Sequence, residues 1–215
     1  MLGWAASGEV WEDESFSDVP AELRRVNDIA FSGDGEPTTY PRFEEAVRIA
    51  AELKAEHGMT AVKIIVLTNM TMFHRESVQR GLAILDQNNG EVWAKLEAGT
   101  EEYYKNVDRS AVRLSRVLEN IREAGRARPI VIQSMFMRLH GEPIPAGEFE
   151  AYLERLCELR DAGCRIKLVQ LYTIARGTAE SYAMPLSTSE LKSLEARFRQ
   201  RLPDVACEVY PGVGP

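Results

Sequence analysis

The chain has 215 residues, of which 45% are hydrophobic and 27% charged, a composition typical of globular proteins. Its formal net charge of −7 argues against a broad nucleic-acid-binding surface. No apolar run reaches the ~18 residues of a membrane span, and no basic segment followed by an apolar core opens the chain, so we expect neither a membrane protein nor a secretion signal. Three cysteines are too few for a disulfide framework and favour a reducing, cytoplasmic location.

Strand-like and helix-like segments alternate along the chain. Apolar, β-branched runs predict strands at Asn27–Ser32, Val62–Thr68, Val92–Ala98, Ile130–Met137, Ile166–Tyr172 and Cys207–Tyr210. Helical spacing of apolar residues predicts helices over Phe43–Leu53, Ala111–Ile121, Phe149–Leu159 and Leu191–Phe198, with a weaker helix over His74–Leu85 interrupted by Gly81. Ser187 and Glu190 form a capping-box signature at the start of the last helix. We therefore expect one domain over 1–215, with residues 1–26 as a helix and loop lead-in.

Alternating strands and helices imply parallel strands joined by right-handed crossovers, in an open sheet or a full or partial barrel. The segment Val92–Ala98 helps to choose between them, because its apolar residues alternate with Trp93, Lys95 and Glu97. A packed sheet core would penalise Lys95 and Glu97, whereas a barrel with a polar lumen accommodates them. An edge strand in an open sheet is the remaining alternative, and we favour the barrel.

The loop between the first strand and the first strong helix reads Phe-Ser-Gly-Asp-Gly-Glu-Pro-Thr, from Phe31 to Thr38. Gly33 and Gly35 allow backbone conformations closed to other residues and let a ligand approach the main chain. The loop is neither a dinucleotide fingerprint nor a P-loop, because Thr38 stands where the third glycine would be and no Gly-Lys-Ser/Thr follows. An isolated tight turn is the alternative interpretation.

This loop resembles the Gly-Gly-Glu loop of radical S-adenosylmethionine (radical SAM) enzymes, most closely the branch that includes the wyosine-type tRNA-modifying synthases. The resemblance implies a partial TIM-type (β/α) barrel that lacks its first strand and cluster loop. It also implies that S-adenosylmethionine is a cofactor and that the backbone of Gly33, Asp34, Gly35 and Glu36 binds its amino group.

Other segments lie where the family places contacts to the cofactor. By that resemblance we expect cofactor binding by a set of polar side chains at strand ends, each of which could equally be structural: Thr68, Asn69, Lys95, Glu97, Gln133, Gln170 and Tyr172.

The family's Cys-x-x-x-Cys-x-x-Cys motif, whose thiolates hold a 4Fe–4S cluster, is absent from these 215 residues. Cys157, Cys164 and Cys207 do not have its spacing, so we expect no metal ligands in this chain. N-terminal truncation is the economical explanation, and a cluster-free pseudoenzyme is the second. Loss of the first strand would leave a sheet edge open to self-association.

Three functional hypotheses follow. The first is the barrel portion of a radical SAM enzyme that, in complete form, uses S-adenosylmethionine and a 4Fe–4S cluster to form a 5′-deoxyadenosyl radical. It would need an electron donor and would act on an unknown small molecule, RNA or protein. The alternative is a non-catalytic SAM- or nucleotide-binding barrel domain acting on a protein partner. The third is an unrelated acid–base barrel enzyme using Lys95, Glu97, Glu36 or His140.

Overall fold

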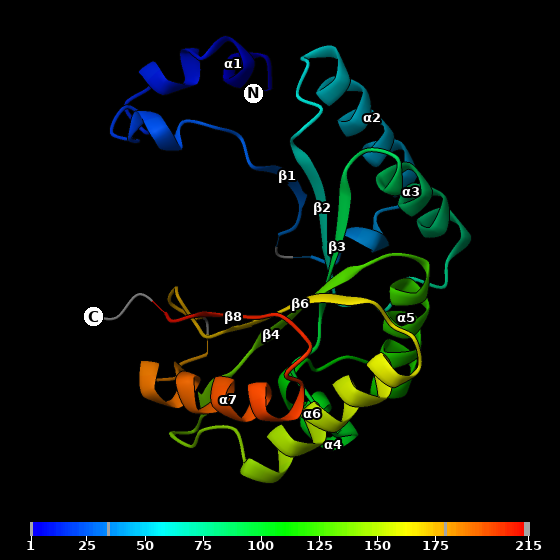
Figure 1. Ribbon diagram of the computed structural model, residues 1–215, viewed down its shortest axis with the longest axis vertical. Helices are drawn as coiled ribbons and strands as arrows, with labels where there is room; N and C mark the ends of the chain where they lie inside the picture. The colour runs from blue at the N-terminus through cyan, green and yellow to red at the C-terminus, as the bar shows by residue number, and fades with distance from the viewer. Residues whose placement is uncertain (1, 34, 179, 213–215) are drawn as a thin grey trace. The chain divides into compact units, whose positions relative to one another are not determined.

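The strands of the computed structural model form a six-stranded parallel sheet in the order β1-β2-β3-β4-β6-β8, and a small antiparallel sheet pairs β5 with β7 (Figure 1). The structure describes residues 2–33, 35–178 and 180–212. In chain order the strands span Asp28–Phe31 (β1), Lys63–Thr68 (β2), Gly90–Lys95 (β3), Ile130–Met135 (β4), Met137–Leu139 (β5), Ile166–Tyr172 (β6), Ala183–Pro185 (β7) and Cys207–Tyr210 (β8).

Helices separate the strands of the large sheet, as the sequence predicts. The α-helices span Leu2–Ser7 (α1), Phe43–Glu56 (α2), Glu76–Asp86 (α3), Glu101–Val107 (α4), Leu114–Ala127 (α5), Ala146–Asp161 (α6) and Thr188–Arg201 (α7). Short 3-10 helices span Glu9–Glu12 (η1), Ala21–Leu23 (η2) and Pro37–Thr39 (η3). None of the helices within the described residues combines the length and apolar character needed to cross a bilayer.

The chain divides into two compact units, and the first comprises Met1–Leu67 and Met72–Val92. Its core lies where β1, β2 and the start of β3 meet α2 and α3, with Phe43 and Leu82 buried. Helix α3 continues through Gly81 without a break. A side chain at this position would meet the ring of Phe43 at 2.7 Å. The glycine that we expected to interrupt this helix therefore allows it to pack closely against α2.

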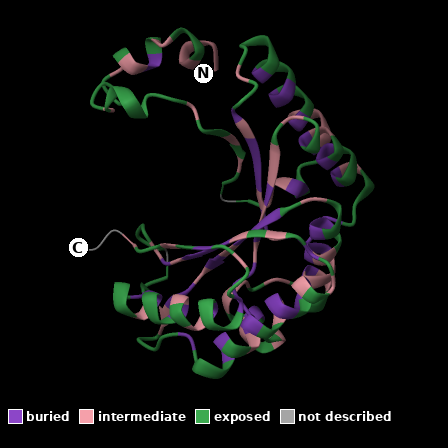
Figure 2. Ribbon diagram, in the orientation of Figure 1, coloured by how far each residue is buried: buried purple, intermediate pink, exposed green. Residues whose placement is uncertain are grey.

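The second unit comprises Thr68–Thr71 and Trp93–Pro215. Strands β4, β6 and β8 pair in parallel, with α6 and α7 together on one side of them (Figure 1). Buried residues follow these strands and the strand-facing sides of the helices (Figure 2). The rings of Phe136, Phe149 and Tyr152 contact one another in the core, at centroid distances of 5.2–5.6 Å.

Most predicted elements match the structure. Strands β6 and β8 have the predicted bounds, and the predicted capping box of α7 is confirmed, because Ser187 Oγ accepts a hydrogen bond from the Glu190 N–H while Glu190 accepts one from the Ser187 N–H. The predicted strand Ile130–Met137 breaks at Phe136, whose N–H donates to the Tyr172 carbonyl. The short, polar helix α4 was not predicted.

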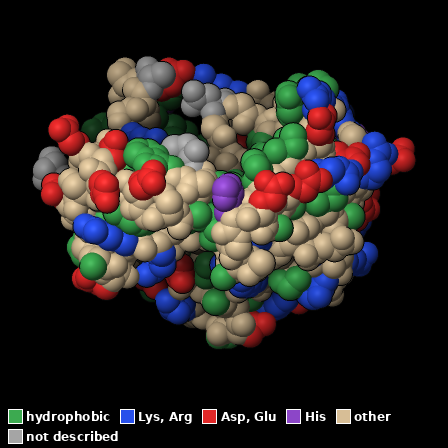
Figure 3. Space-filling model, turned by 90° about the horizontal axis from the view of Figure 1, so that it is seen from above, with side chains coloured by type: hydrophobic (Ala, Val, Ile, Leu, Met, Phe, Trp, Pro, Cys, Tyr) green, Lys and Arg blue, Asp and Glu red, His purple; other side chains and the backbone are tan. Residues whose placement is uncertain are grey.

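The surface is rich in ion pairs, which suits the high content of charged residues. Acidic and basic side chains are interspersed on the face shown in Figure 3. The pairs include Arg48 with Glu44 at 2.8 Å and Arg197 with Glu150 at 2.6 Å. Exposed pairs of this kind contribute little stability, so the core described above dominates the energetics.

Candidate cofactor site

The glycine-rich loop lies in the first unit, between β1 and η3. Gly33 adopts φ +142°, a conformation that favours glycine. Apart from the chain neighbours, no atom of the described residues lies within 4 Å of a Cβ built at Gly33 or Gly35. Glu36 caps η3, since its Oε1 accepts hydrogen bonds from the Thr38 N–H at 3.1 Å and the Thr38 hydroxyl at 2.6 Å. Asp34 lies outside the described residues. The Glu36 side chain thus holds the turn at residues 36–38, and there is open space beside Gly33 and Gly35.

The predicted contacts Thr68 and Asn69 lie in the second unit and build a turn at the end of β2. Thr68 Oγ1 accepts a hydrogen bond from the Met70 N–H at 3.0 Å, and Asn69 Oδ1 accepts from the Thr71 N–H at 3.1 Å. Met70 is fully buried with φ +64°, and its carbonyl accepts a hydrogen bond from the Asn120 amide at 2.7 Å. These side chains therefore have a structural role in holding the turn.

Lys95 follows the alternation predicted for its strand, whereas Glu97 is buried like its apolar neighbours. Val92, Ala94, Leu96 and Ala98 are at most 1% exposed, while Lys95 is half-buried. Glu97 lies just beyond β3 and is only 5% exposed.

The neighbour of Glu97 is Asp108, the C-cap of α4, which sequence reasoning missed. Burial and the adjacent Asp108 carboxylate raise the pKa of Glu97 well above its ordinary value, against the opposing charge of Lys95. Burial raises the pKa of Asp108 from 3.8 to about 6, while hydrogen bonding to Glu97 and the charge of Lys95 lower it. No motif marks Asp108, because only tertiary packing brings it to Glu97.

Gln133, Gln170 and Tyr172 lie on neighbouring strands, and the register places Gln133 beside Gln170 and Gln170 beside Glu208. The Gln133 amide donates to Gln170 Oε1 at 2.9 Å, and the Gln170 amide donates to the Tyr210 hydroxyl at 3.5 Å. Burial, followed by the charge of Glu97, raises the pKa of Tyr172 above its ordinary value, so its hydroxyl stays a hydrogen-bond donor at neutral pH. All of these residues, together with Lys95 and Glu97, therefore lie in the second unit. Hydrogen bonds link Gln133, Gln170 and Tyr210.

The cysteines do not fit an iron–sulfur cluster. Cys157, Cys164 and Cys207 are all buried, and burial raises the thiol pKa of Cys164 and of Cys207 to about 11. A cluster is held by thiolates, whereas burial favours the protonated thiol at Cys164 and at Cys207. Across residues 2–33, 35–178 and 180–212, no group of three or more His, Cys, Asp or Glu residues could hold a metal ion.

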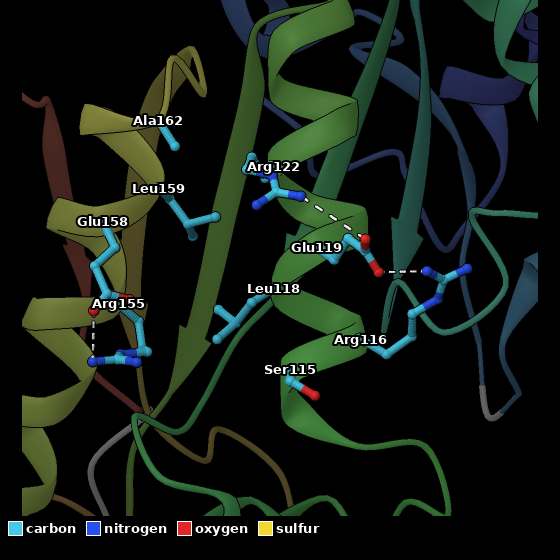
Figure 4. Close-up of a pocket in the computed structure, with 9 residues that line it drawn as sticks. All are labelled: Ser115, Arg116, Leu118, Glu119, Arg122, Arg155, Glu158, Leu159 and Ala162. Atoms are coloured by element: carbon cyan, nitrogen blue, oxygen red, sulfur yellow. Dashed lines mark hydrogen bonds and ion pairs between the residues drawn. The ribbon is translucent and has the colours of Figure 1, made fainter.

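A separate groove of 510 Å³ lies between α5 and α6, in the arginine-rich part of the sequence (Figure 4). Glu119 forms ion pairs with Arg116 and, at 3.9 Å, with Arg122 on α5, and Glu158 pairs with Arg155 on α6 at 2.8 Å. Each arginine is thus matched by a carboxylate of its own helix. This groove is lined by ion pairs, and none of its lining residues is a predicted cofactor contact.

Comparison with known proteins gives matches only among solved structures, because no protein-family model and no curated protein matches the chain. SuiB from Streptococcus suis bound to S-adenosylmethionine aligns over 88% of this chain and 41% of SuiB, with a TM-score of 0.62 and 15% sequence identity. A second SuiB structure aligns over 90% of this chain, with a TM-score of 0.60. A radical SAM methyltransferase from Sphaerobacter thermophilus aligns over 100% of this chain and 58% of the enzyme, with a TM-score of 0.63 and 15% identity.

The chain has the fold of these proteins. The predicted partial (β/α) barrel is therefore confirmed, and the open doubly wound sheet is set aside. At 15% identity the likeness shows the fold alone, and the chain spans less than two thirds of either protein. Which side chains contact a ligand stays a prediction at every position.

Proposed function

We propose that this chain is the S-adenosylmethionine-binding barrel portion of a radical SAM protein. The observation that carries the proposal is the glycine-rich loop, which follows a parallel strand in a fold shared with SuiB bound to S-adenosylmethionine. The open space beside Gly33 and Gly35 suits a ligand that lies against the main chain. When bound, S-adenosylmethionine supplies an activated sulfonium centre.

In this proposal the residues of the loop divide the work. The backbone of Gly33 and Gly35 would bind the methionyl end, because exposed N–H and carbonyl groups in a tight turn form a concave polar surface. Glu36 would act indirectly, since its carboxylate already holds the turn through Thr38.

Calorimetry with S-adenosylmethionine tests the proposal. A methyl group on Gly35 enters empty space without backbone strain, so Gly35→Ala should preserve the fold yet obstruct the ligand. We expect binding by the unmodified chain and a loss of about tenfold or more in affinity for Gly35→Ala, equivalent to ~1.4 kcal/mol. Gly147→Ala is the matched control, because Gly147 also has open space beside it but lies in α6. No binding by the unmodified chain, or equal binding by Gly35→Ala, would overturn the proposal.

A cluster-free binding domain is the second candidate, favoured by the buried, protonated thiols of Cys164 and Cys207. Anaerobic treatment with iron and sulfide, applied to this chain and to a form extended at the N-terminus, separates the two candidates. Broad visible absorbance with stoichiometric iron in the extended form would favour a cluster-bearing protein. S-adenosylmethionine binding without bound iron in both forms would favour the cluster-free domain.

The substrate class is a further part of the proposal. The resemblance to wyosine-type synthases favours a nucleobase of RNA, and the net charge of −7 opposes a large electrostatic contribution to RNA binding. Filter binding of tRNA at low and moderate salt tests this point. Binding that survives moderate salt would support an RNA substrate, and its absence would leave a small molecule or a protein.

A further inference from the structure

The segment after β3 buries two acidic side chains against each other. Glu97 is 5% exposed, and Asp108, at the C-terminal end of α4, lies within hydrogen-bonding reach of it. One oxygen of each carboxyl group, Glu97 Oε2 and Asp108 Oδ2, is buried and has no hydrogen-bond partner among the residues that the structure describes. Both orphaned atoms can accept a hydrogen bond, and neither carboxylate can donate one.

Two ionised carboxylates in this arrangement would be doubly unfavourable. Each would leave a buried oxygen unsolvated, and the two negative charges would repel. A single proton removes both penalties, because the acid O–H of Glu97 then donates to the carboxylate of Asp108. One proton shared by the pair therefore gives both buried oxygens a hydrogen-bond partner.

The charges around the pair are consistent with one shared proton. Lys95 is the cation whose field acts on both carboxyl groups, so one shared proton leaves a net charge of zero over Lys95, Glu97 and Asp108. Burial comes first among the causes that raise the pKa of the nearby tyrosines, and these stay neutral donors. Lys95 on β3 acts on the pair, and three tyrosines respond to its charge: Tyr104 on α4, Tyr152 on α6 and Tyr172 on β6. Glu101 on α4 acts on Tyr104.

We propose that Glu97 and Asp108 form an acid–base site that holds one shared proton at neutral pH and can transfer it to a bound ligand. The site lies beyond the carboxyl end of a parallel strand, where α/β folds place reactive groups. Asp108 and Lys95 are only half-buried, so both residues reach solvent.

The transfer is balanced in protons and charge. The O–H bond of the acid breaks, a lone pair on a ligand oxygen or nitrogen takes the proton, and the electron pair stays on the carboxylate. Lys95 then offsets one of the two negative charges, and the protonated ligand offsets the other when it arrives as a neutral base. The ligand class is therefore a neutral proton acceptor, such as a free amine, and this inference does not depend on S-adenosylmethionine binding.

Infrared spectroscopy of the whole chain tests the proposal, because a protonated carboxyl group has a carbonyl band distinct from that of a carboxylate. We expect this band at pH 7, its loss in Glu97→Gln, and a band midpoint lowered by about one pH unit or more in Asp108→Asn, where the like charge is removed. The band should shift promptly in D₂O, because an acid–base site must exchange its proton. Circular dichroism checks that each variant is folded.

Glu148→Gln is the matched control. Glu148 is also buried, but its carboxylate accepts hydrogen bonds from the N–H groups of Gly99 and Thr100 and from the Thr100 hydroxyl, so it needs no proton. The band and its midpoint should be unchanged in this variant. The proposal is overturned if the band is absent at pH 7, persists in Glu97→Gln, keeps its midpoint in Asp108→Asn, or fails to shift in D₂O.

Discussion

The loop after β1 and the segment after β3 both carry predicted ligand contacts, but the protein builds them in opposite ways. In the loop, Gly33 and Gly35 are exposed and have open space beside the main chain. After β3, Glu97 and Gly99 are buried, and a side chain on Gly99 would meet the Tyr152 backbone nitrogen at 2.0 Å. The loop can offer backbone groups to a ligand, whereas the buried segment offers one side chain whose position is fixed by packing.

The largest expected effect comes from adding a methyl group in the packed region. Gly99→Ala should lower the free energy of unfolding by ~3 kcal/mol, because the backbone of α6 blocks the new atom and must shift. Gly35→Ala in the open loop should change it by less than ~0.5 kcal/mol. Urea denaturation of both variants measures the contrast. Equal stability of the two variants would contradict the difference in packing.

The pH dependence of stability tests the buried carboxyl pair. The folded pKa of Asp108 is raised from 3.8 to about 6, so the folded chain binds this proton more tightly than the unfolded chain. Protonated Asp108 therefore stabilises the folded chain fully below pH ~4. This contribution of ~2–3 kcal/mol to the free energy of unfolding is lost as the pH rises through ~6. Asp108→Asn should remove this loss, so the variant gains stability relative to the unmodified chain between pH 4 and 7. Urea denaturation at several pH values measures this difference. If the stability of Asp108→Asn and of the unmodified chain changed with pH in the same way, the prediction would be wrong.

The smallest expected effect lies in the cap of the loop. Glu36→Ala removes the acceptor for the Thr38 N–H and hydroxyl and should cost about 1 kcal/mol of stability. Glu36→Gln keeps a side-chain oxygen and should stay within about 0.5 kcal/mol of the unmodified chain. Thermal unfolding followed by circular dichroism distinguishes the two variants. If both variants were equally stable, the cap would contribute nothing to the loop.

Local features of the sequence predicted much of the fold. Apolar runs and helical spacing placed the strands of the large sheet and the main helices, because side-chain periodicity depends only on neighbouring residues. The same holds for the capping box at Ser187 and for the turn through Gly33. Helix α4 was not predicted because it has only seven residues and lacks a repeated pattern of apolar residues at helical spacing.

The sequence by itself determined the alternation of strands and helices, the glycine-rich loop and the alternating faces of the strand that leads to Glu97. Tertiary structure alone decided that Asp108 is the neighbour of Glu97 and that Gly81 lets α2 and α3 pack closely. The physical reason is the range of the interactions. Backbone conformation and periodicity act between near neighbours in the chain, whereas burial, and the proton that burial imposes on a carboxyl pair, arise only when separate segments pack together.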